Sequence, residues 1–166
     1  MTSFFKVKKK SKFSKARLGL INTAHGKINT PSFIFCGTKA TVKSVLPSQL
    51  KLARTQIILS NTYHLMLQPG PEVISKEGGL QNFTDWNGPM MTDSGGYQIF
   101  SLGYGSVSEE IKGKNNNAKR KSLIKITEDG ASFRNYLNGD KVFLSPERSI
   151  ELQRDFGADL IFVLDE

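Results

Sequence analysis

The chain has 166 residues, an apolar content of 38%, and 23 Lys and Arg against 15 Asp and Glu, which gives a formal net charge of +8. This length suits one domain with a real core, and no apolar run approaches the roughly 18 residues that a membrane span needs. Cys36 is the only cysteine, which excludes an internal disulfide framework and a multi-cysteine metal site within these residues. We therefore expect a reduced, cytoplasmic setting and no membrane partner.

The basic residues gather in two segments. Residues 1–17 form a basic N-terminal segment, and a second cluster between 103 and 122 contains Lys119, Arg120 and Lys121. We interpret residues 103–122, which are rich in Gly, Asn and Lys, as a flexible inserted loop. An excess of positive charge favours a polyanionic partner such as a nucleic acid, although a solvated basic surface gives the same count.

From residue 18 onward, short apolar runs alternate with helix signals. Residues 18–21 and 26–31 predict a small hairpin with His25-Gly26 near its turn. Buried strands are predicted at 32–36, 56–59, 89–92 and 160–164, and a second hairpin at 122–127 and 131–136. Helices are predicted from Pro47 with Ser48 as cap, over 72–76 with Gly78-Gly79 closing it, and from Ser145 to Gly157. Such alternation is typical of a β/α barrel or of an open α/β sheet.

Polar residues follow each predicted buried strand. They are Gly37-Thr38, Asn61 to His64, Asp93 to Gln98, and Asp165-Glu166. If the strands are parallel, these residues meet at one edge of the sheet. Two carboxylates, an amide and an aromatic ring suit the edge and face of a purine, since a carboxylate accepts from a ring N–H and an exocyclic amine together. The pair Gly95-Gly96 would let the backbone approach a flat ligand closely.

Each of these residues also has a purely structural interpretation. An Asp after a strand often caps a helix, a Gly pair often makes a tight turn, and His64 and Tyr97 could belong to the core. No single residue decides between the two interpretations.

The combination of motifs resembles the tRNA-guanine transglycosylases, the base-exchange enzymes of the queuosine pathway. The resemblance runs from about residue 17 to the end, in the family's order. The matching stretches are 24–26, 30–31, 37–43, 61–67, 69–70, 78–80, 92–98, 129–133, 144–149 and 164–166. The strings Asn61-Thr-Tyr-His-Leu65 and Asp93-Ser-Gly-Gly-Tyr-Gln98 are highly specific.

The resemblance implies a TIM barrel that exchanges guanine at the tRNA wobble position for a 7-deazaguanine base, preQ1 or queuine. By motif, Asp93 would be the general acid/base, and Asn61 would hold it in the empty site. Tyr97 would stack on the base and Asp165 would recognise its polar edge. Ser94 would help to line the pocket, and support would come from Thr62, His64, Gly95, Gly96 and Gln98.

Two departures from the family matter. Its covalent nucleophile and its structural zinc site lie later than Glu166, so the resemblance implies that this chain holds about four of eight barrel strands and is inactive alone. Complete members are expected to dimerise and to bind the anticodon loop, for which Lys119, Arg120 and Lys121 are contact candidates. The alternatives are a non-catalytic tRNA-binding subunit and an inactive truncated product.

Overall fold

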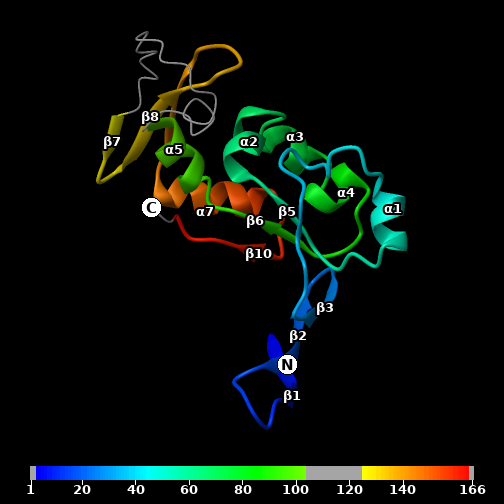
Figure 1. Cartoon of the computed structure of the whole chain (residues 1–166). Coiled ribbons are helices and arrows are strands. Elements are labelled where there is room, and N and C mark those ends of the chain that lie inside the picture. Colours follow the sequence, from blue (N-terminus) through cyan, green and yellow to red (C-terminus); the bar gives the residue numbers. More distant parts are fainter. Residues whose placement is uncertain (1–2, 104–124, 165–166) are drawn as a thin grey trace, which may run out of the picture.

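A computed structural model describes residues 3–103 and 125–164 of the chain. Helices pack against a central parallel sheet, and two antiparallel sheets lie beside it (Figure 1). In chain order the described elements are β1 (Phe5–Lys10), β2 (Arg17–Thr23), β3 (Gly26–Thr30), β4 (Phe35–Cys36), α1 (Pro47–Leu52), β5 (Ile58–Ser60), α2 (Thr62–Leu67), α3 (Pro71–Lys76), α4 (Leu80–Thr84), β6 (Met90–Thr92), α5 (Gly96–Gly103), β7 (Lys125–Thr127), β8 (Gly130–Arg134), β9 (Lys141–Leu144), α7 (Pro146–Asp155) and β10 (Leu160–Ile161).

The central sheet has the order β10-β6-β5-β4, and all its strands run parallel. These are the four predicted buried strands, so the mixed α/β architecture is confirmed. The strands are shorter than predicted: only Phe35 and Cys36 of the run 32–36 pair with β5. The run 160–164 is not buried as expected, since Ile161, Phe162 and Val163 are exposed on the edge strand, which pairs only with β6 among the described strands.

Helix starts follow the predicted proline positions, because proline fixes the φ angle of the first turn and needs no hydrogen-bond acceptor there. Ser145 caps α7 as expected, with its hydroxyl accepting from the Arg148 N–H at 3.1 Å. At α1 the predicted cap is wrong. Ser48 makes no cap bond there, and the Gln49 side chain instead accepts from the Leu46 N–H at 2.8 Å.

One core joins the sheet to its helices. Ile58 and Met90 of the sheet pack in a cluster with residues of α1 to α5, β8, β9 and α7. Leu65, Ile74 and Leu152 within it have no exposed surface. Burying a side chain of this size contributes roughly 1.5–3 kcal/mol, so this cluster fixes how α2, α3 and α7 sit on the sheet.

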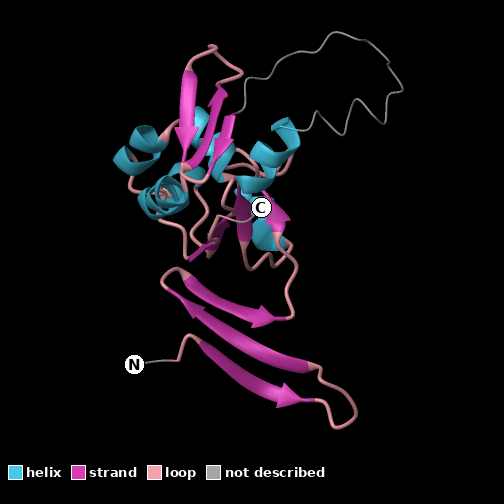
Figure 2. Cartoon of the chain, turned by 90° about the vertical axis from the view of Figure 1, so that its left-hand side faces the viewer, coloured by secondary structure: helices cyan, strands magenta, loops and turns pink. Residues whose placement is uncertain are grey.

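The strands β1, β2 and β3 form an antiparallel sheet that extends away from the helices (Figures 1 and 2). Its β2–β3 turn falls at Ala24-His25, as predicted. Strand β1, within the basic segment 1–17, was not predicted. It docks because the Phe5 ring lies on Gly19 of β2, where an added Cβ would come within 2.5 Å of that ring.

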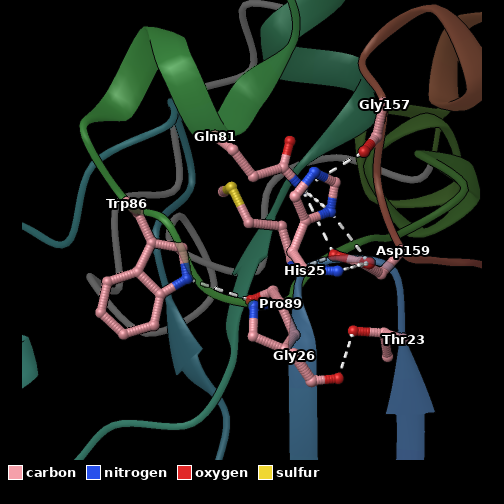
Figure 3. Close-up of polar contacts among 9 residues, drawn as sticks. Thr23, His25, Gly26, Gln81, Trp86, Pro89, Gly157 and Asp159 are labelled. Atoms are coloured by element: carbon pink, nitrogen blue, oxygen red, sulfur yellow. Dashed lines mark hydrogen bonds and ion pairs between the residues drawn. The ribbon is translucent and has the colours of Figure 1, made fainter.

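The β2–β3 turn is tied to the amino ends of β6 and β10 by the buried carboxylate of Asp159 (Figure 3). Asp159 accepts from the His25 N–H at 3.1 Å and from the Met90 N–H at 3.0 Å, and its Oδ1 lies 3.0 Å from His25 Nδ1. The Gln81 amide nitrogen adds contacts to Asp159, His25 and the Gly157 carbonyl. This network lies at the end of the sheet opposite Asp93, where barrel proteins keep stabilising rather than catalytic residues.

The second predicted hairpin is present and has a third strand. Thr127 pairs with Gly130 across the predicted turn, and β9 then pairs with β8. Among the helices of the described residues, none is long and apolar enough to cross a membrane.

Candidate functional site

The carboxyl ends of β4, β5 and β6 meet as the parallel arrangement requires. The hydrogen-bond ladder continues past the strands, with Asn61 N–H donating to the Thr38 carbonyl at 3.1 Å and Asp93 N–H donating to the Ser60 carbonyl at 3.2 Å. Three of the four predicted strand ends therefore lie side by side. The fourth, at Asp165, lies outside the described residues.

Asp93 follows β6 directly and is held by the two residues that follow β5. The Asn61 side-chain amide donates to one carboxylate oxygen, and the Thr62 N–H donates to the other at 2.9 Å. The Thr62 hydroxyl donates to the Asp93 carbonyl. Hydrogen bonds to both oxygens fix the direction in which the carboxylate points.

Asn61 has a second task that ties the site to the fold. Its side-chain oxygen accepts from the His64 N–H at 3.0 Å and so caps α2. Because the oxygen is engaged with the helix, the amide nitrogen is left facing Asp93. One side chain thus sets both the start of α2 and the position of the carboxylate.

Tyr97 lies in the first turn of α5, four residues after Asp93 in the chain, and is 67% exposed. Its ring is therefore not part of the core. The turn before it is fixed by Ser94, a buried residue whose hydroxyl accepts from the Gly96 N–H at 3.1 Å. The Ser149 hydroxyl of α7 donates to the Ser94 carbonyl at 2.8 Å, which anchors this turn to the helix layer.

Gly95 has a structural reason to be glycine. Its φ angle is +80°, and an added Cβ would come 3.2 Å from the Tyr63 backbone nitrogen. Glycine at this position lets the turn after Asp93 lie close to α2. The sequence predicted a close approach of the backbone to a ligand, whereas the approach seen here is to a helix.

His64 sits beside the site in a mixed aromatic and basic surrounding. Its ring packs edge-on against Tyr63 at 5.3 Å and against Tyr136 at 6.3 Å between centroids. Burial, and then the charge of Lys39, lower the pKa of His64 below its ordinary value of 6.5. His64 is therefore neutral at pH 7. Lys39 itself lies over the Tyr136 ring, with its Nζ 5.5 Å from the centroid.

Three buried side-chain polar atoms at the ends of β5 and β6 or just after them have no hydrogen-bond partner within the part of the chain that the structure describes. They are Ser60 Oγ, His64 Nδ1 and Gln98 Oε1. A buried polar atom without a partner costs free energy, so each would be stabilised by a ligand or water that reached it.

Other predicted residues do not join this group or cannot be placed. The candidate tRNA contacts Lys119, Arg120 and Lys121, and all of the loop 103–122 except Gly103, lie outside the described residues. Gly103 ends α5. A separate hollow of about 300 Å³ is lined by residues including Val42, Leu50 and Trp86, and Asp93 is not among them.

Comparison with known proteins decides the family. The family model for queuine tRNA-ribosyltransferase matches residues 11–166. The chain belongs to this family. The resemblance to the tRNA-guanine transglycosylases that the motifs indicated is thereby confirmed.

Curated family members with the name queuine tRNA-ribosyltransferase are similar over the whole chain. The protein of Roseiflexus sp. (strain RS-1) is 46% identical over 100% of this chain and 42% of its own length. The protein of Protochlamydia amoebophila is 47% identical over 100% of this chain and 43% of its own length. The protein of Chlamydia pneumoniae is 49% identical over 94% of this chain and 41% of its own length. The chain therefore spans about two fifths of the length of these relatives.

The motifs did not reveal every residue that shapes the site. Tyr136 reaches His64 from the β8–β9 connection, and Ser149 reaches Ser94 from α7. Both contacts join residues 50 or more positions apart, and no local pattern marks them. Thr62 was predicted only as support, yet it holds Asp93 through two separate groups.

Proposed function

We propose that the chain contributes half of the active site of a tRNA-guanine transglycosylase, which replaces guanine at the tRNA wobble position by a 7-deazaguanine base. The observation that carries the proposal is the geometry at Asp93, a carboxylate held by Asn61 and Thr62 at the carboxyl end of a parallel sheet. The exposed ring of Tyr97 follows four residues later in the chain, in the first turn of α5. Family membership supplies the reaction class.

We further propose that the sheet is part of a TIM barrel. The strands β4, β5, β6 and β10 are adjacent in space in the order in which they occur in the chain, with no reversal of the kind that divides a doubly wound sheet. On the face away from the Ile58–Met90 core, the register aligns the half-buried Leu59, Met91 and Leu160. Rows of apolar residues at one level are typical of a barrel interior.

Base exchange needs a carboxylate nucleophile at the ribose C1′ and a proton donor for the departing purine. Asp93 takes the second role, giving a proton to the leaving guanine and accepting one from the incoming base. Tyr97 stacks on the base and Ser94 forms part of the pocket wall. We assign recognition of the polar base edge to Asp165 and the covalent nucleophile to residues outside this chain.

The remaining parts of the proposal concern partners. The substrate is the anticodon loop of a tRNA in the cytoplasm, the second substrate is preQ1 or queuine, and the complete enzyme is a homodimer. Zinc does not fit the residues at hand, since the described part of the chain brings no three His, Cys, Asp or Glu side chains together. We assign zinc to residues outside the chain and derive no step from it.

Two other functions compete with this one. A tRNA-binding subunit without catalysis would have no use for a carboxylate held at both oxygens, so the bonds at Asp93 favour the enzyme. An inactive fragment is distinguished by assay. We expect the 166-residue chain alone to show no exchange of labelled guanine into tRNA, and turnover by it would contradict the assignment of the nucleophile.

The assignment of Asp93 is tested by Asp93→Asn in a full-length protein that carries this sequence as its N-terminal part. Guanine exchange should fall by at least about 100-fold, because general acid/base catalysis contributes about that much or more, while filter binding of tRNA is retained. The exposed Asp85→Asn is the matched control. Weakened tRNA binding with normal turnover at saturating tRNA would refute the role.

A further inference from the structure

Basic and acidic residues are distributed very unevenly along the chain. Residues 1–71 contain 12 Lys and Arg and no Asp or Glu, and the first acidic residue is Glu72. The remaining 95 residues contain 11 Lys and Arg against 15 Asp and Glu. The positive charge of the molecule therefore belongs to its first part, which includes the projecting sheet β1-β2-β3 (Figure 2).

The register of this sheet gathers three lysines on one face. Lys6 pairs with Leu20 and Asn29 across the sheet, and Lys27 pairs with Asn22 one step further along. Lys9 pairs with Leu18, which alternation in β2 places on the same side as Leu20. We call Lys6, Lys9 and Lys27 the basic face. The opposite face carries Phe5, Ile21 and Ile28 in register, and at its far end the pair Lys10 and Arg17.

The lysines of the basic face are free to meet a partner. All three are exposed. The ion pairs within the described residues are His25–Asp159 and Arg148–Glu151, so no carboxylate of that part neutralises the basic face. The nearby β1–β2 loop adds Lys12 and Lys15, and between them Phe13 is 97% exposed.

Lysines on an edge strand can also serve only to prevent sheets from associating, and β1 is an edge strand. That purpose does not require the absence of acidic residues, since Glu also protects an exposed edge. A fully exposed Phe13 would increase association rather than prevent it.

We propose that the basic face and the β1–β2 loop form an RNA-binding surface distinct from the base pocket. Phosphates of the RNA backbone contact Lys6, Lys9 and Lys27, and Phe13 stacks on an unpaired base. The choice of tRNA as the RNA rests on the proposed function. Because the β2–β3 turn meets the amino ends of β6 and β10 while Asp93 follows the carboxyl end of β6, this surface contacts nucleotides other than the wobble guanine.

The test uses a fluorescently labelled tRNA acceptor-arm minihelix with unpaired 3′ bases, which has no anticodon loop. Its affinity for the whole chain is measured by anisotropy at several salt concentrations. The triple variant K6Q/K9Q/K27Q should reduce the slope of log affinity against log salt by roughly 2–3, because each of the three phosphate contacts contributes roughly 0.7–0.9. The control K76Q/K141Q/R154Q removes the same charge at exposed positions elsewhere and should leave most of the slope.

Phe13→Ala should weaken minihelix binding by roughly tenfold and leave binding to a fully paired duplex unchanged. Equal slopes for the two triple variants would overturn the proposal, as would wild-type binding by K6Q/K9Q/K27Q. Lysine-dependent binding to phosphatidylglycerol vesicles, with none to the minihelix, would also overturn it and indicate a membrane surface. Asp93→Asn should not alter minihelix binding, so failure of base exchange and failure of this proposal give separate results.

Discussion

Thr62 positions Asp93 through its backbone and its side chain at once. The N–H orients the carboxylate, and the hydroxyl, which is fully buried, satisfies the Asp93 carbonyl. The β5 end therefore determines the position of a residue that follows β6. A substitution that displaced Thr62 would shift the Asp93 carboxylate without changing the chemistry of that group.

Substitution of Thr62 by Val removes the hydroxyl bond and keeps the shape and the backbone N–H. We expect the free energy of unfolding to fall by about 1–2 kcal/mol, because the Asp93 carbonyl loses its buried donor. Urea denaturation measures this, and Thr62→Ser, which retains the hydroxyl, should lie closer to wild type. Equal stability of the Val and Ser variants would contradict the bond.

The lowered pKa of His64 provides a second prediction. Burial is the larger cause and the charge of Lys39 the smaller, so Lys39→Gln should raise the pKa of His64 toward 6.5 without restoring it fully. Because the folded-state pKa is lowered, protonation favours the unfolded chain, and this contribution to stability is lost as the pH falls below 6.5.

An NMR titration of the imidazole protons measures the pKa of His64, with His25→Gln used to assign the only other histidine. Lys43→Gln is the control, because Lys43 is equally exposed and is not among the causes of the shift. A pKa of His64 that does not respond to Lys39→Gln would contradict the electrostatic contribution.

The contact between the β2–β3 turn and Asp159 joins the projecting sheet to the helix-covered one. Burial acts to raise the pKa of Asp159, but bonds from the Met90 N–H and from His25 outweigh it, so the pKa lies below its ordinary value of 3.8. With a lowered folded-state pKa, the ionised carboxylate stabilises the fold above pH 3.8. That stabilisation is lost as the pH falls below this value.

Asp159→Asn replaces one acceptor oxygen by a donor that faces N–H groups. We expect the free energy of unfolding at pH 7 to fall by about 1–3 kcal/mol, and the difference from wild type to shrink as the pH is lowered toward 3. Urea titrations at the two pH values measure this. Asp155→Asn, at an exposed position, is the charge-matched control, and equal losses in both variants would exclude a specific role of the network.

At the scale of elements, the sequence predicts the buried parallel strands and the long helix α7 better than the short helices. The parallel strands and α7 follow from apolar runs and from the Ser145-Pro146 start. The helices α2, α4 and α5 and strand β9 were not predicted. Asn61 shows why: its neighbours were interpreted as pocket residues, whereas Asn61 also caps a six-residue helix. Strand β1 was missed because the alternation of Phe5-Lys6-Val7-Lys8 is short and runs into further lysines.

The candidate site was predictable in its members but not in its contacts. Asp93, Asn61 and Tyr97 were all selected from motifs. Asn61 and Asp93 follow neighbouring parallel strands and are hydrogen-bonded to each other, and Tyr97 lies in the helix that comes next. The bonds from Thr62 and the approach of Tyr136 depend on how α2 and the β8–β9 connection pack, which a linear pattern does not specify.

At the scale of the whole molecule, the central sheet as formed by the described strands ends in β10 on one side and β4 on the other. Ile161 is 44% exposed and Val163 73% exposed beside β10. Unpaired edges with apolar side chains promote association between chains. We expect the 166-residue chain to self-associate at micromolar concentrations.

The double variant I161K/V163K should shift this equilibrium toward the monomer in sedimentation velocity, because charged side chains protect an exposed edge. Lysines at the exposed Leu52 and Val73, two apolar positions on helices, form the control. A wild-type chain that stays monomeric throughout the concentration range would contradict the expectation.

Gln153 has a consequence for the position of the segment after β10. Its amide nitrogen donates to the Phe162 carbonyl at 2.8 Å and its oxygen accepts from the Phe162 N–H at 2.9 Å, as a neighbouring backbone would. The same oxygen accepts from Thr92 at the end of β6. The backbone of the segment after β10 therefore takes its partners from a side chain of α7, and its position depends on how α7 is seated on β6. Residues that follow it in a longer chain would continue from a position that one side-chain amide has set.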